Sequence, residues 1–491
     1  MNEIKFGTDG WRAVISDGFT FHNVRRVAQA ACDVARKTSK SRLLLVGFDR
    51  RFFSDKFAET AAQVATANGF RVELSREPIS SPTLSSQVRQ RKAALGFMIT
   101  ASHNPYYFNG FKLKGAHGGS VDDIIARSVE DRLDAGEIQE GEESGKKVDF
   151  SGNYLASLKK WVRVPNLNSL KGPVIFDGLH GPGASLFEKL TNANKKIVFI
   201  RKGVDPLFGG VNPEPIETNL DLLKETVIAK KASIGIAVDG DADRIGVVDD
   251  TGRYLPPQTV MPLILLHLIE NKKMKGKVVQ TVSMGYLPER IAAQFKLPFE
   301  VVPVGFKHVA RKMGEEKVLI GGEESGGYGV GLWSPERDGL LCALLLLEML
   351  AVKKKPLSLL VNDMFSRYGQ SYFKRVDIKL TDTFDGPAWL EHIKTILTPT
   401  IAGVPVKSVV TIDGIKVITQ DDSWFLMRPS GTEPLLRTYA EASTPQLLES
   451  FVVEAGRLAN TEPPSVKKAA EDAKKLKKKK LKKAADNRRN K

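Results

Sequence analysis

The sequence predicts an α/β protein with several domains, in which three related α/β units precede an α+β unit. The 491 residues exceed one domain, since domains of about 100–150 residues are the most common size. Three successive segments each contain two apolar runs that end in a polar loop, with helical patterns between such runs. Strands alternating with helices favour mostly parallel sheets, and ligands collect outside the carboxyl ends of such strands.

The first segment contains two buried-strand runs, 43–48 and 94–99, with a helical pattern at 54–67 between them. The second run leads into the hexamer TASHNP, in which Pro105 ends the strand and places Ser102 on a turn at the sheet edge. An exposed serine on a rigid turn is a candidate nucleophile or phosphate carrier. Taken alone, the hexamer suits an ordinary strand-ending turn equally well.

The second segment ends in the apolar run 233–238, and Asp239, Asp241 and Asp243 follow it directly. If the chain curls there, three carboxylates converge on one cation, and oxygen ligands suit Mg²⁺, Mn²⁺ or Ca²⁺ rather than zinc. The alternative is a solvated acidic turn. Against that alternative, three packed carboxylates repel one another and Arg244 alone cannot balance them.

The third segment contains the runs 277–282 and 318–320, and the glycine-rich loop GGEESGG follows the second run. Glu323 offers an acceptor and Ser325 a hydroxyl on a loop that can approach a ligand closely. These two groups suit the vicinal hydroxyls of a sugar, although the loop by itself is a weak signal.

Three further polar residues are candidates for the surroundings of Ser102. Arg12 ends the turn-rich sequence FGTDGWR, His103 follows the serine, and Lys112 lies shortly beyond it. They could stabilise phosphate charge, and one of them could move a proton. The alternative is a set of solvated surface charges.

The fourth segment has a different pattern, typical of a separate α+β unit. Residues 374–380 alternate as a half-exposed strand, 409–417 suggest a hairpin, 424–427 form an apolar run, and 445–458 a helix. After the apolar run, the sequence RPSGTEP collects a guanidinium, two hydroxyls and glycine-exposed amides, which could clamp a phosphate or form a plain turn. The candidate phosphate ligands are Arg428, Ser430, Gly431, Thr432 and Arg437.

Composition and charge limit the remaining function classes. Cys32 and Cys342 are the two cysteines, both in apolar helical patterns, so a disulfide framework or a cysteine metal site is not expected. The N-terminus lacks an apolar signal core, and the longest apolar run, 340–352, is too short to span a bilayer. These features predict a cytoplasmic protein without a membrane segment.

The net charge of +16 is concentrated at the C-terminus. Residues 466–491 contribute +10, which leaves +6 for the rest of the chain. The lysine-rich segment has too few apolar residues to pack as a helix face, so a disordered basic tail is expected. Such a tail could bind nucleic acid or anionic surfaces weakly, or it could have no dedicated partner.

The motifs FGTDGWR, TASHNP, DGDADR, GEESGG and RPSGTEP, in this order, resemble those of the α-D-phosphohexomutase superfamily, the phosphoglucomutase/phosphomannomutase enzymes. The resemblance runs from Ile4 to about Asn460. It implies four domains round a central cleft, three related mixed-sheet α/β domains and a C-terminal α+β phosphate-binding domain. The expected domains are 1–150 with the phosphoserine loop, 151–253 with the metal loop, 254–368 with the sugar loop, 369–460 with the phosphate clamp, and the tail 461–491.

The resemblance also implies roles for the motif residues. Ser102 would carry the phosphoryl group, and it would hold Mg²⁺ together with Asp239, Asp241 and Asp243. Glu323 and Ser325 would bind sugar hydroxyls. Arg12, Lys112 and Arg244 would line the transfer site, with His103 as a positioning residue, and Arg428, Ser430, Gly431, Thr432 and Arg437 would bind the non-reacting phosphate.

The implied reaction interconverts hexose 1-phosphate and hexose 6-phosphate through a hexose 1,6-bisphosphate, which also serves as activator. The expected partners are therefore small sugar phosphates, and the expected assembly is a monomer or weak dimer. In several phosphomannomutase and phosphoglucosamine mutase relatives the sugar loop ends in histidine, whereas Gly327 stands here. Because of that departure, Lys112 or Arg12 is expected to take the proton-transfer role. The departure also favours glucose phosphates as substrates, with mannose phosphates as a further possibility.

Three alternatives stay open at this point. The chain could prefer glucosamine or mannose phosphates within the same superfamily. It could be a phosphatase that uses the same aspartates, or a non-catalytic nucleic-acid-binding protein that acts through its basic tail.

Overall fold

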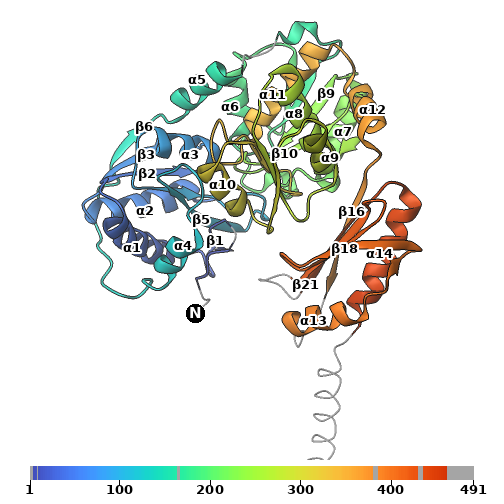
Figure 1. Cartoon of the computed structure of the whole chain (residues 1–491). Helices are drawn as coiled ribbons and strands as arrows, with labels where there is room; N and C mark the ends of the chain where they lie inside the picture. The colour runs from blue at the N-terminus through green and yellow to red at the C-terminus, as the bar shows by residue number, and fades with distance from the viewer. Residues whose placement is uncertain (1–3, 8, 163–165, 380–384, 430–434, 462–491) are drawn as a thin grey trace, which may run out of the picture. The chain divides into compact units, whose positions relative to one another are not determined.

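The computed structural model describes residues 4–7, 9–162, 166–379, 385–429 and 435–461. These residues form two compact units, Met1–Gly369 and Gln370–Lys491, and each unit is described by itself (Figure 1). The first unit contains three α/β sheets, and the second contains one antiparallel sheet. The four-domain α/β fold expected from the sequence is confirmed. The predicted basic tail lies outside the described residues.

The first sheet of unit 1 has six strands in the order β1-β5-β4-β2-β3-β6. Strands β4, β2 and β3 and the edge strand β6 are parallel, β5 pairs antiparallel with β4, and β1 pairs antiparallel with β5 at the other edge. The strands are β1 (Trp11–Val14), β2 (Leu43–Phe48), β3 (Arg71–Ser75), β4 (Leu95–Ile99), β5 (Phe108–Gly115) and β6 (Lys146–Val148). The helices are α1 (Phe21–Thr38), α2 (Ser54–Ala67), α3 (Ser81–Gln90), α4 (Asp123–Glu130) and α5 (Ser151–Trp161).

Strand β2 explains why this region is a layered structure with helices on both faces of the sheet. All six of its residues are buried, as expected for a strand covered on both faces. Leu44 and Val46 pack in one core with α1 and α2, while Leu43 and Leu45 pack in a second core with α3. Alternate side chains of one strand therefore fill two cores.

The second sheet has the order β11-β10-β9-β7-β8, with β9, β7 and β8 parallel. The turn between β9 and the antiparallel β10 carries the acidic motif. The strands are β7 (Val174–Asp177), β8 (Ile197–Ile200), β9 (Ile234–Val238), β10 (Ile245–Val248) and β11 (Tyr254–Leu255). The helices are α6 (Gly183–Leu190) and α7 (Asp221–Ala229), with short 3₁₀ turns η1 (Leu167–Ser169), η2 (Phe208–Gly210) and η3 (Glu217–Asn219).

The third sheet has the order β13-β12-β14-β15, and β15 is its antiparallel member. The sugar-loop motif follows β14, at the carboxyl end of a parallel strand. The strands are β12 (Lys277–Thr281), β13 (Phe299–Val302), β14 (Val318–Gly322) and β15 (Tyr328–Gly329). The helices are α8 (Pro257–Leu266), the π-helical η4 (His267–Asn271), α9 (Leu287–Gln294), α10 (Phe306–Glu315), α11 (Gly339–Lys353) and α12 (Leu357–Tyr368).

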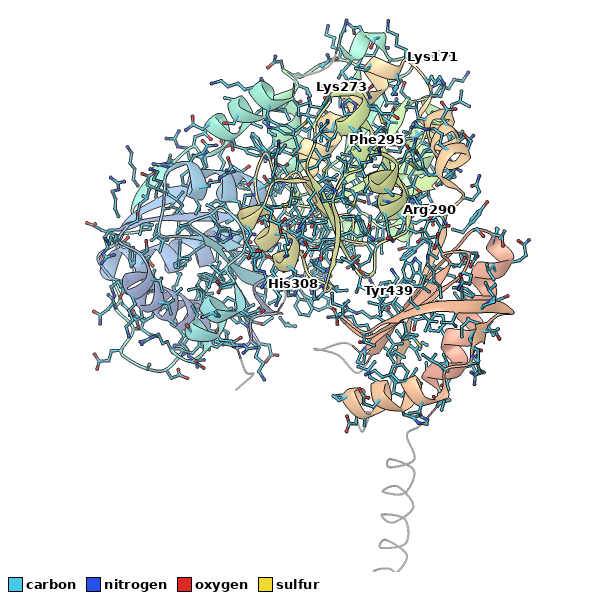
Figure 2. The ribbon with its side chains drawn as sticks, viewed as in Figure 1. Lys171, Lys273, Arg290, Phe295, His308 and Tyr439 are labelled. Carbon is cyan, nitrogen blue, oxygen red and sulfur yellow. The ribbon has the colours of Figure 1, made fainter. Side chains whose placement is uncertain are left out.

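The last helices of unit 1 follow their sequence signals. Helix α11 contains the longest apolar run and is buried along most of its length. Asp338 caps its N-terminus by accepting a hydrogen bond from the Leu341 backbone at 2.9 Å. Arg290 of α9, labelled in Figure 2, donates to the Tyr368 carbonyl at 2.9 Å and thereby ties down the end of α12.

Unit 2 is an antiparallel sheet in the order β16-β21-β20-β19-β18-β17, with helix α14 packed on β20, β21 and β16. Tyr439 of β21 is fully buried (Figure 2). The strands are β16 (Tyr372–Lys379), β17 (Thr400–Ile401), β18 (Val404–Val410), β19 (Ile415–Thr419), β20 (Trp424–Pro429) and β21 (Leu435–Ala442). The helices are α13 (Gly386–Ile396) and α14 (Pro445–Ala459).

Two expectations from composition can be compared with this fold. Cys32 and Cys342 are buried free thiols on α1 and α11. Among the described residues, no helix has both the length and the hydropathy needed to cross a bilayer.

Candidate active site

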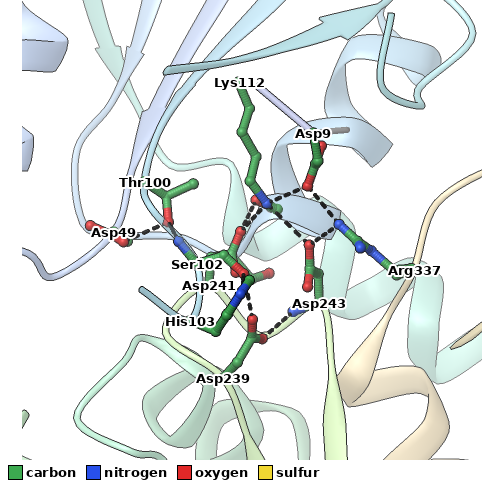
Figure 3. A network of polar contacts seen from close by, with 12 residues as sticks. Asp9, Asp49, Thr100, Ser102, His103, Lys112, Asp239, Asp241, Asp243 and Arg337 are labelled. Carbon is green, nitrogen blue, oxygen red and sulfur yellow. Dashed lines mark hydrogen bonds and ion pairs between the residues drawn. The ribbon is translucent and has the colours of Figure 1, made fainter. Parts of the chain in front are cut away.

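Ser102 lies on a turn immediately after β4, as predicted, but it is fully buried rather than exposed. Its φ of +54° lies in the left-handed region, which non-glycine residues adopt rarely and often at functional sites. Its hydroxyl donates to Asp239 Oδ2 at 2.7 Å, and its backbone NH donates to Thr100 Oγ1 at 2.9 Å. The strained turn thus presents the serine hydroxyl directly to the acidic motif (Figure 3).

Arg51 holds the serine turn through its carbonyl groups. The guanidinium donates to the carbonyls of Ser102 and Asn104, each at 2.7 Å, and to that of Pro105 at 2.8 Å. Its own partner is buried Asp49, whose carboxylate lies 3.3 Å away. These charge-assisted contacts on one short turn fix the position of the serine.

The acidic motif brings three carboxylates together, as predicted. Oxygens of Asp239, Asp241 and Asp243 all lie within 4.8 Å of one another, and the three residues are fully buried. Asp239 Oδ1 accepts the backbone NH groups of Asp243 and Arg244 at 2.9 and 3.0 Å, which curls the loop. A Cβ on Gly240 would lie 2.4 Å from the Ser102 carbonyl oxygen, so glycine permits the close approach of the two loops.

The hydrogen bonding within the acidic motif fits a bound cation. Oδ2 of Asp241 accepts from Ser81 at 2.5 Å and Lys112 at 2.7 Å, and Oδ2 of Asp243 accepts from Lys112 and Arg337. Oδ1 of both aspartates is buried and accepts no hydrogen bond from the residues that the structure describes. Buried carboxylate oxygens without a donor are costly unless a cation binds them, and an all-oxygen set suits Mg²⁺, Mn²⁺ or Ca²⁺.

The pKa of Asp239 supports the same interpretation. Burial, followed by the charges of Asp243 and Asp241, raises this pKa well above its ordinary value. Burial would also raise the pKa of Asp241, but the Lys112 ammonium and hydrogen bonds from Lys112 and Ser81 lower it. Arg244 and the hydrogen bond from Ser102 oppose the rise at Asp239 without cancelling it, so the charge of Asp239 is less well compensated than that of Asp241.

Lys112 is the central cation of the network (Figure 3). Its ammonium lies 2.7 Å from Asp9, 2.7 Å from Asp241 and 3.1 Å from Asp243. Burial lowers its pKa, but these three carboxylates raise the pKa above the ordinary lysine value. Lys114, two residues along β5 and on the same face, ion-pairs with Glu336 and lies 3.7 Å from Asp9.

Arg12 and Arg244 are charged neighbours of His103, the residue that follows the serine. Arg12 of β1 donates to Asn104 Oδ1 at 2.6 Å, and Arg244 is almost buried, 3.5 Å from Glu214. His103 Nδ1 lies 3.5 Å from Ser102 Oγ. Burial and the charges of Arg244, Arg12, Lys112 and Arg51 lower the pKa of His103 well below its ordinary value, so the imidazole is neutral at pH 7.

The predicted sugar loop presents Glu323 and Ser325 after β14. Glu323 Oε2 accepts from Arg337 Nη1 at 3.1 Å. Burial raises the pKa of Glu323 to about 7, although Arg337 opposes that effect. Ser325 Oγ is buried and without a hydrogen-bond partner among the described residues. The loop thus offers a carboxylate and a free hydroxyl to a polar ligand.

The predicted phosphate clamp lies in unit 2 and is described in part. Arg428 and Arg437 face each other on paired strands β20 and β21, and Arg428 Nε donates to Asp413 at 2.8 Å. The remaining predicted members, Ser430, Gly431 and Thr432, lie outside the described residues.

Four polar residues that contact the site were not singled out by sequence reasoning. Asp9 lies inside the FGTDGWR motif and could have been found from its position beside Arg12. Arg51 belongs to the polar loop after the apolar run 43–48, and that position could have pointed to it. Ser81 and Arg337 lie in segments without a distinctive local pattern, and only the fold brings them to the acidic motif.

Comparisons with known proteins identify the family of the chain. The models of phosphoglucomutase/phosphomannomutase α/β/α domains I, II and III match residues 3–140, 152–252 and 256–368, and the C-terminal domain model matches 390–456. The chain is 30% identical to a phosphoglucosamine mutase of Mesorhizobium japonicum, over 91% of this chain and 96% of the relative. It is 28% identical to a phosphoglucosamine/phosphogalactosamine mutase of Sulfurisphaera tokodaii, over 92% and 98% of the two chains.

A solved structure gives the same result. A Thermus thermophilus protein assigned as a phosphomannomutase superposes with a TM-score of 0.82 at 31% identity, over 94% of this chain and 99% of that chain. The domain models cover most of the chain in the expected order, and they extend over both units. The chain therefore belongs to the phosphoglucomutase/phosphomannomutase family and is an enzyme of the phosphohexomutase type.

Proposed function

We propose that the protein interconverts hexose 1-phosphate and hexose 6-phosphate, with glucose phosphates as the main substrate and mannose phosphates as a further one. The observation that carries this proposal is the 2.7 Å hydrogen bond from Ser102 Oγ to Asp239 of the acidic motif. It places a candidate phosphoryl carrier beside a candidate cation site, which is the combination that phosphoryl transfer needs.

In the proposed reaction, Ser102 starts as a phosphoserine. The free hydroxyl of the hexose monophosphate attacks the phosphorus, the serine–phosphorus bond breaks, and a hexose 1,6-bisphosphate forms. The bisphosphate turns end for end, and the serine oxygen takes the other phosphoryl group. The attacking hydroxyl loses its proton to a base. Three carboxylates hold Lys112 as an ammonium and Arg12 is a guanidinium, so both supply charge, whereas the neutral imidazole of His103 can accept the proton.

The residues around the serine would stabilise charge rather than form bonds. Lys112, Arg12 and Arg244 supply positive charge to the transferring phosphoryl group, and His103 positions the serine. Asp239, Asp241 and Asp243, with an oxygen of the phosphoserine, would hold Mg²⁺. That ion would neutralise phosphoryl charge when bound.

Substrate binding would use the sugar loop and the residues of the predicted phosphate clamp. Glu323 and Ser325 would accept and donate hydrogen bonds to sugar hydroxyls, in keeping with the free Ser325 hydroxyl. Arg428, Ser430, Gly431, Thr432 and Arg437 would bind the phosphate that does not react. A hexose 1,6-bisphosphate would act as primer, because an unphosphorylated serine has nothing to transfer.

A second candidate is a phosphoglucosamine mutase, favoured by the names of the two relatives reported above. The same serine chemistry would serve it, with an amino group at C2 of the sugar. The two candidates differ in substrate preference and not in mechanism.

The test is an isomerisation assay on glucose, mannose and glucosamine 1-phosphates, with Mg²⁺ and a trace of bisphosphate. The largest kcat/KM should belong to glucose 1-phosphate; the largest value for glucosamine 1-phosphate would select the second candidate. Release of inorganic phosphate in place of isomerised sugar would instead identify a phosphatase. Mass spectrometry of active protein should find a phosphate on Ser102.

The decisive variant is Ser102→Ala, which removes the carrier and should lower turnover by at least about 10⁴-fold. Ser128→Ala is the matched control, because this half-buried serine of α4 donates its hydroxyl hydrogen bond to the Ile124 carbonyl within its own helix. Substantial mutase turnover by Ser102→Ala would refute the proposed role of the serine.

A further inference from the structure

Arg337 joins three carboxylates that come from separate parts of the chain. Its Nη2 lies 2.6 Å from Asp9 and 2.6 Å from Asp243, and its Nη1 lies 3.1 Å from Glu323. Asp9 precedes β1, Asp243 belongs to the acidic motif, and Glu323 belongs to the sugar loop. One guanidinium therefore bridges the acidic motif and the sugar loop. Figure 3 shows its contacts with Asp9 and Asp243.

The side chain of Arg337 is held in one place. It is 4% exposed, and its guanidinium lies 5.4 Å from the centre of the Phe306 ring. Its Nε is buried and has no hydrogen-bond partner among the described residues. A buried guanidinium whose two terminal nitrogens bind three carboxylates fixes their orientation through its planar fork, which a lysine cannot reproduce.

Gly327 provides the space that this side chain occupies. A Cβ at position 327 would lie 2.3 Å from Arg337 Cδ and 3.2 Å from Cγ. Its φ is ordinary, unlike that of Gly326 at +82°, so glycine at 327 is required for space and not for backbone conformation. The loop glycine and the arginine form a matched pair.

We propose that Arg337 is a positioning residue, which passes through the space left by Gly327 and orients the Glu323 carboxylate for sugar hydroxyls. The inference rests on the proposed function, because it assigns Glu323 to the sugar. Arg337 contacts neither the reacting serine nor, in this proposal, the sugar itself. Arg337 would affect sugar binding only through the position of the Glu323 carboxylate.

The charges that face Glu323 give the inference a distinctive pH signature. Arg337 and Arg244 favour its ionised form, while burial and Glu324 oppose ionisation. Removing the Arg337 charge should therefore move the pKa of Glu323 upward, by about one unit or more. If the ionised carboxylate binds the sugar, the acid limb of kcat/KM against pH should move upward by the same amount.

The experiment measures kcat, KM and the pH profile for the best hexose phosphate in Arg337→Gln, Arg337→Lys and Gly327→Ala. Arg337→Gln should raise KM roughly tenfold with a smaller change in kcat, and should move the acid limb upward. Arg337→Lys keeps the charge but not the fork, so its acid limb should stay near that of the wild type while KM rises.

Gly327→Ala tests the matched pair without removing a charge. The added methyl group must displace the arginine, so KM should rise about as much as in Arg337→Gln. In the Arg337→Ala background the same change should have little further effect, because the colliding atoms are gone. Gly314→Ala is the control, since a Cβ at that position of α10 meets nothing within 4 Å.

Two outcomes would overturn the inference: a Gly327→Ala enzyme as unaffected as Gly314→Ala, or an acid limb that Arg337→Gln leaves in place. If Arg337→Ala does not fold, the KM values of Gly327→Ala and Arg337→Lys still test whether Arg337 positions Glu323. A wild type that converts no hexose phosphate would refute the proposed function instead. In that case the pH dependence of unfolding gives the pKa of Glu323 without any activity. Comparing this pKa in the wild type, Arg337→Lys and Arg337→Gln tests the contact between Arg337 and Glu323 independently of the proposed function.

Discussion

Glu323 is a carboxyl group whose charge depends on pH near neutrality. Burial raises its pKa to about 7, against an ordinary value of 4.5. Because the folded state holds the proton more tightly than the unfolded state, protonation stabilises the fold fully below pH 4.5. That contribution is lost as the pH rises towards 7. An ionised Glu323 in the sugar loop therefore makes the folded enzyme less stable at neutral pH than it is at pH 4.5.

Glu323→Gln should remove this pH dependence. Between pH 4.5 and 7 the wild type should lose roughly 3 kcal/mol of unfolding free energy relative to the variant, from about 1.36 kcal/mol for each unit of pKa shift. Denaturant titrations of both proteins across pH 4.5–8 measure the difference. Parallel stability curves for the two proteins would show that the Glu323 pKa is ordinary in the folded state.

Some residues of the candidate site could be predicted from the sequence, and others could not. Ser102 and the three aspartates stand in local motifs, so their chemistry could be recognised before any fold was known. Arg337 and Ser81 reach the same site from distant segments whose local sequence carries no signal. Long-range contacts of this kind depend on how the domains pack, which a local pattern does not encode. The burial of Ser102 was missed for the same reason, because loops of another domain cover its turn.

At the scale of elements, buried strands were the most predictable feature. The runs 43–48, 94–99 and 318–320 became β2, β4 and β14 with shifts of at most two residues at their ends. Continuous apolar runs bounded by polar loops leave few alternatives. The antiparallel strands β1, β5, β10 and β15, which lie at a sheet edge or next to one, were not predicted. Three of them, β1, β10 and β15, have four residues or fewer, which is too short for a periodic pattern.

Helix α11 has an N-terminal cap that does more than end the helix. Besides the Leu341 NH, Asp338 accepts hydrogen bonds from the Tyr154 hydroxyl at 2.8 and 2.9 Å and from the Trp333 indole at 3.1 Å. Burial raises the pKa of Asp338 to about 6. The cap therefore links α11 to α5 of another domain.

Asp338→Ala should destabilise the protein by about 3 kcal/mol, since it removes the cap and leaves two buried donors unpaired. Asp122→Ala is the matched control: this residue caps the exposed helix α4 through the Ile125 NH at 2.8 Å and has no buried partner of that kind among the described residues. It should cost about 1 kcal/mol or less. Thermal or denaturant unfolding compares the two, and equal losses would contradict the linking role of Asp338.

At the scale of the whole molecule, the basic tail and the catalytic body are separable in sequence. Residues 466–491 carry most of the net charge, whereas every group of the candidate active site precedes them. The family assignment covers the body to residue 456. We therefore expect the tail to be dispensable for mutase chemistry.

Deletion of 466–491 should leave kcat/KM within about twofold of the full-length value, because no proposed ligand of the sugar or metal is removed. Binding of the full chain to a generic nucleic acid at low salt should weaken on deletion, and should weaken with added salt. Loss of mutase activity on deletion, together with an active Ser102→Ala enzyme, would favour the nucleic-acid-binding alternative over an enzyme.

The close approach of Gly240 to the Ser102 carbonyl has a consequence for how such enzymes can be recombined. A single methyl group at position 240 would lie 2.4 Å from that oxygen, and the backbone NH of Ser81 is bonded to the Asp241 carbonyl at 3.0 Å. The serine loop and the acidic loop are therefore fitted to each other at the backbone. Chimeras that import the first domain from a relative should keep this fit only when its second domain is imported with it.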